Sequence, residues 1–348
     1  MLKVGIIGLG TVSPIHLFSI NNSPYADLVA VCDIDSNRAK DKCEMTHCES
    51  NTYYTNYNTY YTNYKEMIDK EDLDLVHICL PHHLHTEVSK YALAKGLHVF
   101  CEKPVDVSYE KTKELYDFYQ TYKDRQKLGI CFQNRYNKTV QKLKELLEDN
   151  KEEVFGVKGL VTWYRGMDYY KQAAWRGKIK EAGAGVIINQ AIHTLDLMGF
   201  VTGKDWKSLT ATMTKLMNKE IEVEDTASAF IEYEDGVNGF FMATNAYSIT
   251  DSIELQVISK REKYTIKDNR LYNKALECLA EDDKSDATKD YYGAGHEKLI
   301  NKFYKAIIDD TDDYCDLASA METMEIIQAI INSSKENIEI KKEEIIND

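Results

Sequence analysis

Two ionisable side chains lie in patterns that suit proton transfer at a hydroxyl group. Lys103 is the centre of a Glu-Lys-Pro motif at 102–104, and His193 lies in a Gly-x-x-x-Asn-x-x-x-His-x-x-Asp pattern at 185–196. A base must come within ~3 Å of the oxygen that it deprotonates. An unperturbed histidine has a pKa of ~6.5, whereas the lysine pKa of ~10.4 must first be lowered by burial or charge. We therefore expect His193 to accept the proton and a charged Lys103 to stabilise the alkoxide, although the two roles could be exchanged.

The pattern around His193 predicts a helix with one polar face. Asn189, His193 and Asp196 are separated by four and three residues, so on one continuous helix they share a side. Asn189 offers hydrogen bonds but cannot titrate, and we expect Asp196 to orient a neighbour. A histidine in such a segment can also be an ordinary core residue, but the company of Lys103 favours a functional one. The residues expected to take part in catalysis are Lys103, Asn189 and His193.

A glycine turn follows the first apolar run of the chain. It reads Gly-Leu-Gly-Thr-Val-Ser at 8–13 and precedes Pro14, a residue suited to the first turn of a helix. The first glycine permits a tight turn, the second lets the backbone approach a pyrophosphate, and the helix amino end attracts phosphate. Ser13 replaces the usual third small residue, which predicts slightly looser packing of helix on strand. The turn residues expected to bind a dinucleotide are Gly8, Gly10, Thr11 and Val12.

An acid ends the second apolar run, at roughly the ~20-residue interval where a carboxylate binds the adenosine ribose. This residue is Asp33, and its charge would repel a 2′-phosphate. Arg38 could neutralise such a phosphate, or could simply be exposed on the next helix. We therefore expect Asp33 and Arg38 to lie at the cofactor and predict NAD, with NADP as the alternative.

Polar groups also follow the fourth and fifth apolar runs. The carboxyl ends of strands line the ligand crevice of an open parallel sheet, so these groups should face the nicotinamide half of the cofactor. The histidines at 82, 83 and 85 could instead bind a metal, but no carboxylate is arranged with them and His85 could cap the following helix. We predict no metal. The residues expected at the nicotinamide end are Leu80, Pro81, His85, Glu102 and Lys103.

The first third of the chain alternates short apolar runs with helical patterns, which is typical of a parallel sheet covered on both faces. Expected strands are 3–7, 28–33, 74–80, 97–101 and 127–132, and expected helices are 15–22, 37–46, 86–95 and 109–122. Alternating segments at 156–164, 209–215, 228–233, 239–244 and 253–259 then indicate an antiparallel or mixed sheet. The Asp235-Gly236 pair is a hairpin signal. Helical patterns at 295–308 and 317–333 are followed by a short strand and a solvated tail after Lys335.

These elements predict an α/β protein with two domains, since 348 residues of which 43% are hydrophobic can form two cores. Residues 1–132 should form a Rossmann domain with a doubly wound parallel sheet. Residues 133–348 should form an α+β domain with a large open, mostly antiparallel sheet, whose C-terminal helices can pack back on the first domain.

The composition argues against several partners. A net charge of -14 disfavours nucleic acid and anionic membranes. The chain shows neither a signal-peptide pattern nor an apolar run of ~20 residues, so we expect a soluble, cytoplasmic protein. Of the eight scattered cysteines, Cys43 and Cys48 lack zinc-site spacing. The cysteines inside apolar runs, expected to be buried free thiols, are Cys32, Cys79, Cys101 and Cys131.

A duplication stands out between the second and third helical patterns. The Thr-Tyr-Tyr-Thr-Asn-Tyr sequence at 52–57 recurs at 59–64. We expect a surface loop, with a tyrosine-rich binding surface as the alternative.

Taken together, these motifs resemble the glucose-fructose oxidoreductase, inositol dehydrogenase and MocA family. The family's order and separations are found for the Gly-x-Gly turn, Asp33, Pro81, the Glu-Lys-Pro motif and the 185–196 pattern, over nearly the full chain. The resemblance implies that Glu102 approaches the nicotinamide ribose, that Lys103 reaches the reacting hydroxyl and that His193 is a catalytic or substrate-binding group. Inositol dehydrogenases often have Asp at position 189, so the asparagine here argues against a proton relay through that position.

The resemblance implies an NAD(P)-dependent oxidoreductase that transfers hydride between nicotinamide and a secondary alcohol or ketone of a sugar, inositol or sugar derivative. It also implies a homodimer or homotetramer formed through the C-terminal sheet. Two alternatives stay open: a glycosidase-like enzyme that uses NAD without net redox change, and a non-catalytic NAD(P)-binding sugar sensor or regulator.

A polyhydroxylated substrate requires hydrogen-bonding groups and aromatic faces around it. Some of the candidates could equally be ordinary sheet aromatics, as for Tyr164 and Trp175, or surface charges, as for Arg165 and Arg176. The residues expected to contact substrate are Asn134, Arg135, Tyr164, Arg165, Asp168, Trp175, Arg176, Asn189 and His193.

Overall fold

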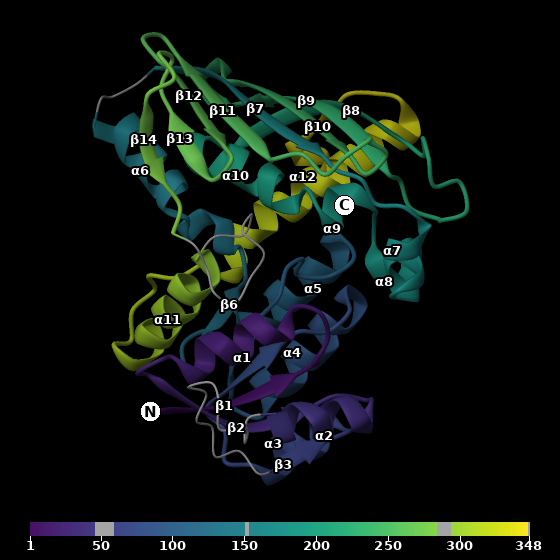
Figure 1. Ribbon diagram of the computed structural model, residues 1–348, viewed down its shortest axis with the longest axis vertical. Helices are drawn as coiled ribbons and strands as arrows, with labels where there is room; N and C mark the ends of the chain where they lie inside the picture. The colour runs from purple at the N-terminus through teal and green to yellow at the C-terminus, as the bar shows by residue number, and fades with distance from the viewer. Residues whose placement is uncertain (46–58, 150–152, 284–293, 347–348) are drawn as a thin grey trace.

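The computed structural model describes residues 1–45, 59–149, 153–283 and 294–346 of the chain (Figure 1). A six-stranded sheet is built from the first third of the chain, and a nine-stranded sheet is built from later segments. The two sheets lie at opposite ends of the molecule with helices between them. The α/β class, with a Rossmann sheet followed by a large, mostly antiparallel sheet, is confirmed.

The first sheet has the strand order β3-β2-β1-β4-β5-β6, and all its strands are parallel. Val4, Leu75 and Val99 are fully buried, as expected for strands with helices on both faces. The strand order reverses between β1 and β4, and ligands bind outside the carboxyl ends of strands at such a point. The strands are β1 (Leu2–Ile7), β2 (Ala26–Cys32), β3 (Thr59–Tyr61), β4 (Leu75–Ile78), β5 (His98–Cys101) and β6 (Leu128–Ile130). The helices are α1 (Ser13–Asn21), α2 (Ser36–Met45), α3 (Tyr64–Lys70), η1 (His82–Leu84), α4 (His85–Ala94) and α5 (Tyr109–Tyr119).

The strands and helices expected in this part are confirmed to within a few residues, but β3 and α3 were missed. The expectation of a surface loop is wrong for part of the duplication, because Thr59–Tyr61 is the edge strand β3 and pairs with β2. Its Tyr and Thr side chains suit a half-buried strand at a sheet edge. The copy at 52–57 lies outside the described residues.

The second sheet has the order β14-β13-β12-β11-β7-β10-β9-β8-β15, and β7 with β10 is its parallel pair. The expected hairpin is confirmed: Asp235 and Gly236, with φ values of 55° and 76°, join antiparallel β9 and β10. Strands β12 to β14 were missed. The strands are β7 (Val154–Thr162), β8 (Trp206–Thr214), β9 (Thr226–Tyr233), β10 (Asn238–Thr244), β11 (Glu254–Ser259), β12 (Lys263–Lys267), β13 (Arg270–Tyr272), β14 (Cys278–Glu281) and β15 (Ile340–Lys341).

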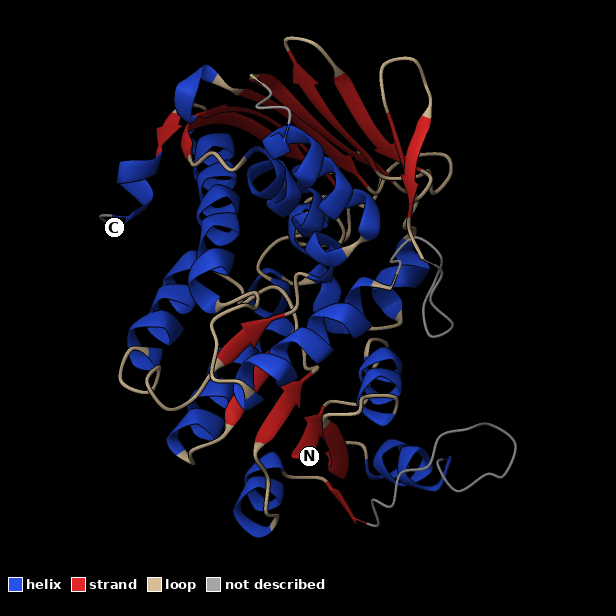
Figure 2. Cartoon of the chain, turned by 90° about the vertical axis from the view of Figure 1, so that its left-hand side faces the viewer, coloured by secondary structure: helices blue, strands red, loops and turns tan. Residues whose placement is uncertain are grey.

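Helices cover one face of the second sheet and leave the other face open (Figure 2). On the covered side, α10 lies directly on β7, because a Cβ on Gly159 would come within 2.7 Å of Thr194 and Met198. On the other side, Phe230 and Phe240 are 45% and 56% exposed. The helices are η2 (Gln133–Tyr136), α6 (Lys138–Asp149), α7 (Met167–Lys171), η3 (Ala174–Gly177), α8 (Ile179–Ala182), α9 (Val186–Asn189), α10 (Ile192–Thr202), η4 (Glu234–Gly236), α11 (Gly295–Ile308), α12 (Leu317–Glu336) and α13 (Lys342–Ile346).

The continuous helix expected around His193 is wrong. Helix α9 ends at Asn189, α10 begins at Ile192, and the chain bends by 54° at this break. The start of α9 is held by the buried carboxylate of Glu224, which accepts the N–H groups of Gly185 and Ile187 at 2.8 and 3.1 Å. Because α10 packs separately on β7, position 189 does not share a helix face with the residues at 193 and 196.

The end of the chain returns to the first sheet. The Ile130 N–H donates to the Cys315 carbonyl at 2.9 Å, and Gly129 forms an isolated bridge with Asp316. Helix α12 then packs on both α5 and β6 of the first part and β8 of the second sheet. The predicted short strand is confirmed as β15, but the expected solvated tail is wrong for α13, in which Ile345 is buried.

Buried free thiols are confirmed at the four predicted positions. Among the described residues, the free cysteines are Cys32, Cys79, Cys101, Cys131 and Cys315, which are buried, and Cys278, which is exposed. The side chains of Cys43 and Cys48 lie outside the described residues.

In the described part of the chain, no single helix has both the length and the apolar composition for a membrane crossing. One bent pair, Ile179–Asn189 with Ile192–Thr202, meets both conditions when its two segments are taken together.

Candidate active site at the nucleotide-binding edge

The glycine turn links β1 to α1 at the carboxyl edge of the first sheet. Gly8 has a φ of +92°, and a Cβ there would lie 2.4 Å from a backbone oxygen of β4's end, so only glycine fits. A Cβ on Gly10 would meet nothing within 4 Å, which leaves the backbone open to a pyrophosphate. The buried hydroxyl of Ser13 donates to the Gly10 carbonyl at 2.9 Å. The other predicted turn contacts are the exposed Thr11 and the half-buried Val12.

Asp33 is held rigidly beside this turn. Its Oδ2 accepts the N–H of Leu9 at 2.8 Å and its Oδ1 accepts the N–H of Asp35 at 2.9 Å. Nη1 of Arg38 lies 3.3 and 3.2 Å from the two carboxylate oxygens. The guanidinium is therefore already paired with a carboxylate, which reduces what it can offer to a 2′-phosphate.

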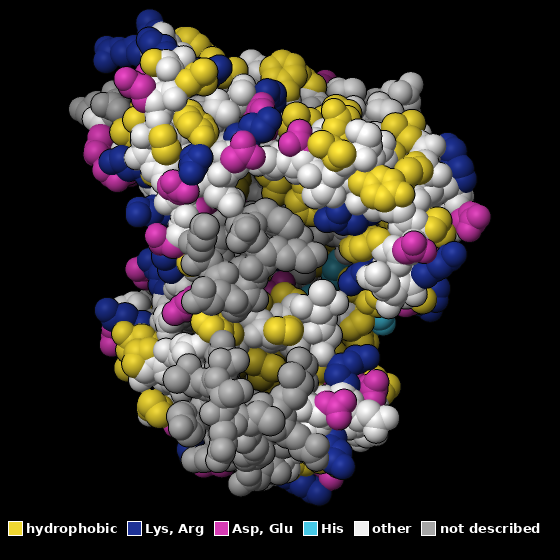
Figure 3. All heavy atoms as spheres, in the orientation of Figure 1, with side chains coloured by type: hydrophobic (Ala, Val, Ile, Leu, Met, Phe, Trp, Pro, Cys, Tyr) yellow, Lys and Arg dark blue, Asp and Glu magenta, His cyan; other side chains and the backbone are white. Residues whose placement is uncertain are grey.

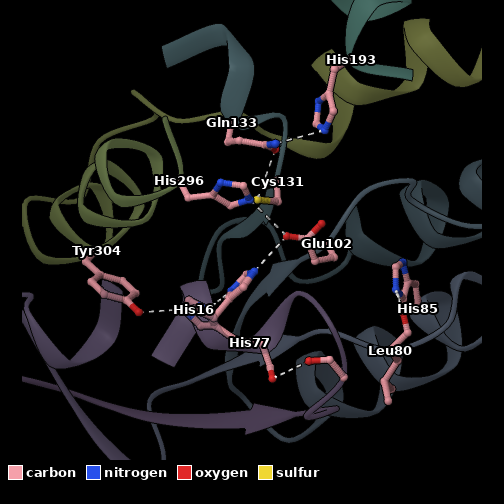
Figure 4. Close-up of polar contacts among 12 residues, drawn as sticks. His16, His77, Leu80, His85, Glu102, Cys131, Gln133, His193, His296 and Tyr304 are labelled. Atoms are coloured by element: carbon pink, nitrogen blue, oxygen red, sulfur yellow. Dashed lines mark hydrogen bonds and ion pairs between the residues drawn. The ribbon is translucent and has the colours of Figure 1, made fainter. Parts of the chain in front are cut away.

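His85 joins the two loops at the nicotinamide end of the edge. Its Nδ1 lies 2.8 Å from the Pro104 carbonyl oxygen and its Nε2 lies 2.8 Å from the Leu80 carbonyl oxygen (Figure 4). Pro81 separates Leu80 from η1, and the bond between Lys103 and Pro104 is cis. Because both ring nitrogens meet carbonyls, the ring positions the loops that carry Leu80 and Lys103.

Lys103 extends from the loop after β5 toward α9. Its Nζ donates to the carbonyl oxygen of Asn189 at 3.4 Å. Burial lowers the pKa of Lys103 from its ordinary value, against the opposing attraction of Glu102. The amide Nδ2 of Asn189 is buried and has no hydrogen-bond partner among the described residues. The structure thus brings the first two predicted catalytic residues together and leaves an unused donor beside them.

His193 is buried at the start of α10. Its Nε2 lies 3.2 Å from Nε2 of Gln133, and its Nδ1 has no hydrogen-bond partner among the described residues. Burial, followed by the charge of Lys103, lowers the pKa of His193 well below its ordinary value. The ring is therefore neutral over the ordinary working range of pH, and it is a weaker base than its unperturbed pKa suggested.

A buried chain of hydrogen bonds, which sequence reasoning missed, leads to Glu102 (Figure 4). Tyr304 Oη lies 2.8 Å from His77 Nε2, and His77 Nδ1 lies 2.8 Å from His16 Nδ1. Nε2 of His16 then lies 2.9 Å from Oε1 of Glu102, and Nε2 of His296 lies 3.9 Å from the same oxygen. Within an otherwise apolar strand β4, the histidine at position 77 was the signal that could have revealed this chain.

This chain keeps Glu102 ionised. Burial alone would raise the pKa of the carboxyl group, but the hydrogen bond and charge of His16, with further help from His296 and Lys103, lower it below its ordinary value. Burial lowers the pKa of His77 well below its usual range, so that ring stays neutral. The network therefore places one fixed negative charge next to the lysine.

His82 and His83 do not form the metal cluster weighed from the sequence. Their Nδ1 atoms lie 3.0 and 3.3 Å from the carbonyl oxygens of Ala182 and Glu181 at α8. Among the described residues, a different set of donor atoms lies within 4.8 Å of one another, from His16, Glu102 and Cys131. We assign it no metal, because Glu102 accepts the His16 hydrogen bond and burial raises the pKa of the Cys131 thiol well above its ordinary value.

Of the predicted substrate residues, Asn134 and Arg135 are buried in η2. The Asn134 Oδ1 has no hydrogen-bond partner among the described residues, so it can serve a ligand. Arg135 is different, because its Nε donates to Asp196 at 2.9 Å and its Nη2 to the Ser319 carbonyl at 3.0 Å. Arg135 therefore joins α10 to α12, and its paired guanidinium has fewer donors left for a substrate.

The remaining substrate candidates lie on the segment between β7 and α8. Trp175 packs its ring 4.6 Å from that of His82. Arg165 and Arg176 are half-buried beside aromatic rings, whereas Tyr164 and Asp168 are exposed. Figure 3 shows acidic and basic side chains interspersed over one face of the molecule and histidine side chains in the recess between its two halves.

Two family models match the chain. The "Oxidoreductase family, NAD-binding Rossmann fold" matches residues 2–129, and the "GFO/IDH/MocA C-terminal domain" matches residues 140–264. Curated relatives include the uncharacterized oxidoreductase YrbE of Bacillus subtilis, 24% identical over 68% of this chain, and the inositol 2-dehydrogenase of Salmonella typhimurium, 25% identical over 68%. The matched region spans 64% and 65% of these two relatives.

Solved structures share the fold over almost the whole chain. The WlbA dehydrogenase from Bordetella pertussis, in complex with NADH and UDP-GlcNAcA, has a TM-score of 0.84 with 22% identity over 98% of each chain. The myo-inositol 2-dehydrogenase from Lactobacillus plantarum has a TM-score of 0.81 with 21% identity, covering 98% of this chain and 99% of its own. The two family models, which follow one another along the chain at 2–129 and 140–264, identify the protein as a member of the Gfo/Idh/MocA family of oxidoreductases.

Proposed function

We propose that this protein is an NAD-dependent dehydrogenase or reductase that acts on a secondary alcohol or ketone of a sugar, inositol or sugar derivative. The observation that carries the proposal is the approach of Lys103 Nζ to the carbonyl of Asn189, a residue whose amide Nδ2 has no hydrogen-bond partner among the described residues. Asn189 Nδ2 can donate a hydrogen bond and Asn134 Oδ1 can accept one. A hydroxyl group both donates and accepts, so a polyol can satisfy both atoms.

The proposed chemistry divides between Lys103 and His193. When bound, the nicotinamide supplies the acceptor or donor of hydride. Because burial lowers the pKa of Lys103, its Nζ can accept the hydroxyl proton during oxidation. His193 accepts a hydrogen bond from Gln133 at Nε2, so its proton lies on Nδ1, where it can donate to the substrate oxygen. This exchanges the roles expected from unperturbed pKa values.

NAD, rather than NADP, is the proposed cofactor. Asp33 is fixed beside the glycine turn, and its carboxylate is paired with Arg38. A ribose 2′-hydroxyl can donate to a carboxylate, whereas a 2′-phosphate would meet the negative charge of Asp33, whose side chain is 6% exposed.

The proposed substrate class is supported by relatives of known activity. The inositol 2-dehydrogenases and the levoglucosan dehydrogenase of Pseudarthrobacter phenanthrenivorans act on carbohydrate-like molecules by name. WlbA binds a nucleotide sugar. These proteins share 22 to 25% of aligned residues with this chain, so they support a class and not one compound.

We further propose that a second copy of the chain covers the open face of the nine-stranded sheet, giving a dimer or a tetramer. Phe230, Phe240 and Met242 are 45, 56 and 43% exposed there. The two phenylalanine rings lie 5.2 Å apart and form one continuous apolar patch. A like face from another copy would bury it.

The proposed function is tested by the absorbance of NADH when the protein and NAD are mixed with sugars, inositols and nucleotide sugars. Turnover in the wild-type protein that is lost in both Lys103→Ala and His193→Ala supports the dehydrogenase. Product formation with retained NAD and no net NADH would favour the glycosidase-like alternative. Binding of NAD and sugar with no chemistry at all would favour a sensor or regulator.

A further inference from the structure

Two arginines are stacked on aromatic rings in the segment between β7 and α8. Cζ of Arg165 lies 4.6 Å from the ring centroid of Trp163, and Cζ of Arg176 lies 4.4 Å from that of Tyr169. Cζ of Arg165 also lies 5.8 Å from the ring centroid of Tyr169, and Cζ of Arg176 lies 6.0 Å from that of Trp175. Such stacking holds a guanidinium plane in place and leaves its N–H edge available. We call these five residues the arginine–aromatic cluster.

Most N–H donors of the two guanidinium groups have no hydrogen-bond partner among the described residues. A guanidinium has five of them, and Arg165 uses Nη1 for the Tyr164 carbonyl at 2.7 Å and the Thr250 hydroxyl at 3.0 Å. Arg176 uses Nη1 for the Tyr169 carbonyl at 3.2 Å. No carboxylate among the described residues forms an ion pair with either arginine, although the chain has 57 acidic and 43 basic residues. Two half-buried cations that form no ion pair within the described part of the chain favour binding of an anion.

The cluster is connected to the reactive residues by short contacts. The hydroxyl group of Tyr169 accepts a hydrogen bond from Gln190 at 2.8 Å. Gln190 directly follows Asn189, whose carbonyl accepts the hydrogen bond of Lys103. At its other end the cluster meets η1, because the Trp175 ring packs against the ring of His82. The aromatic partners of the two arginines therefore contact the residue that follows Asn189 and the helix η1 that follows Pro81.

We propose that Arg165 and Arg176 form an anion subsite that binds a carboxylate or phosphoryl group of the substrate. This inference rests on the proposed function and narrows it, because the preferred substrate is then an acidic or phosphorylated sugar and not a neutral polyol. Two fixed guanidinium groups can each bind an oxyanion through paired N–H donors. The aromatic rings beside them can lie against a sugar ring.

Calorimetric titration of the NADH-bound protein tests the subsite directly. The probes are D-glucuronate, glucose 1-phosphate and glucose, so that the two anions separate a carboxylate from a phosphoryl preference. We expect at least one anion to bind about 10- to 100-fold more tightly than glucose. In the double variant Arg165→Gln/Arg176→Gln, the preference for the anion over glucose should disappear. In the wild-type protein, sodium chloride should weaken this preference. Arg125→Gln, which changes an exposed arginine elsewhere, is the matched control.

The outcomes separate the subsite from the proposed function. The proposal is overturned if neither anion binds at millimolar concentration, if glucose binds equally well, or if the arginine variants keep the preference. If neutral sugars are oxidised equally well by the wild-type protein and the arginine variants, the dehydrogenase function is supported and the anion subsite is not. Anion binding that needs both arginines, with NADH neither formed nor consumed in the presence of any alcohol or ketone tested, would keep the subsite and remove the redox function.

Discussion

Nε2 of Gln133 lies 3.2 Å from Nε2 of His193, and this contact determines which nitrogen of the ring carries the proton. The amide nitrogen can only donate, and the thiol of Cys131, 3.8 Å from the amide oxygen, supports this orientation of the amide. The Nε2 atom of His193 is therefore an acceptor and Nδ1 carries hydrogen. A hydrogen-bond donor at Nδ1 suits stabilisation of the charge that develops on the substrate oxygen, while Lys103 exchanges the proton.

Changing Gln133 to Glu should reverse this tautomer. A carboxylate accepts where the amide donated, so the proton of His193 should move to Nε2. We expect kcat for ketone reduction to fall by about ten- to a hundredfold. Nitrogen-15 NMR of the histidine ring reads the tautomer directly, with Gln133→Met as a control that removes the contact without imposing a charge. Unchanged ring shifts in the Glu variant would contradict the assignment.

The proton acceptor can be identified from the pH dependence of oxidation. Lys103 accepts a proton only when neutral, and its pKa is lowered from 10.5. Thus kcat/KM should rise with pH through that lowered pKa and level off above it. Since the pKa of His193 lies well below 6.5, a histidine base would place the rise on the acid side of that value. In Lys103→Arg, the side chain stays charged. The kcat/KM for oxidation should therefore fall by ~100-fold or more, and its rise with pH through the lysine pKa should disappear. If the rise of kcat/KM with pH is retained in this variant, Lys103 is not the proton acceptor.

The contacts of Asp33 predict the cofactor preference. In Asp33→Asn the negative charge and one acceptor are lost, so we expect about tenfold weaker NAD binding and a smaller preference for NAD over NADP. Arg38→Ala should instead increase that preference, since it removes the nearby positive charge. Fluorescence titration with NADH and NADPH measures both constants. Equal effects of the Asn variant on the two cofactors would refute the role of this carboxylate.

Glu224 should make stability depend on pH. Burial raises its pKa from 4.5 to about 7, against the hydrogen bonds from Gly185 and Ile187. The folded protein therefore keeps a proton that the unfolded chain releases, and the stabilisation is complete below about pH 4.5 and lost as the pH rises through 7. Relative to Glu224→Gln, the wild-type protein should lose on the order of 3 kcal/mol between pH 5 and 8. Urea unfolding of both proteins at each pH measures this, and parallel curves would contradict it.

The open sheet face predicts an oligomer that one charge can disrupt. Phe240→Glu places a carboxylate in the apolar patch beside Phe230, and we expect the protein to become monomeric at micromolar concentration. Light scattering measures the mass. Ile308→Glu is the matched control, because this side chain is 52% exposed on α11 and away from the sheet. A wild-type monomer, or an oligomer that survives the Phe240 change, would refute the interface.

The sequence predicted those elements whose signals are local. The glycine turn, the parallel strands and the Asp235-Gly236 hairpin each follow from neighbouring residues, and all three are present. The break between α9 and α10 could not be predicted, because the run around it is almost entirely buried and shows no helical periodicity. It depends on Glu224, far along the chain, which holds the amino end of α9.

The same limit applies to the site. The closeness of Leu80 and the Glu-Lys-Pro motif could be anticipated, since the carboxyl ends of parallel strands meet at one edge. The bond between His16 and His77 joins residues 61 positions apart, and their pairing depends on how α1 lies against β4. Burial lowers the pKa values of Lys103 and His193, and the extent of burial cannot be read from residue spacing. Arg135 for this reason was assigned to the substrate, although it is paired with Asp196 inside the protein.

Helix α12 has a consequence for how this protein can evolve. It is the last long helix of the chain, yet it completes the packing of α5 and β6 as well as that of β8, and the residues just before it bond to β6. If the chain were divided only after β6, the nucleotide-binding half would lose its packing against α12. Exchanging the substrate domain on this half thus requires two junctions, one after β6 and one before α11, with strands β7 to β14 exchanged as an insert between them while β15 stays with α12.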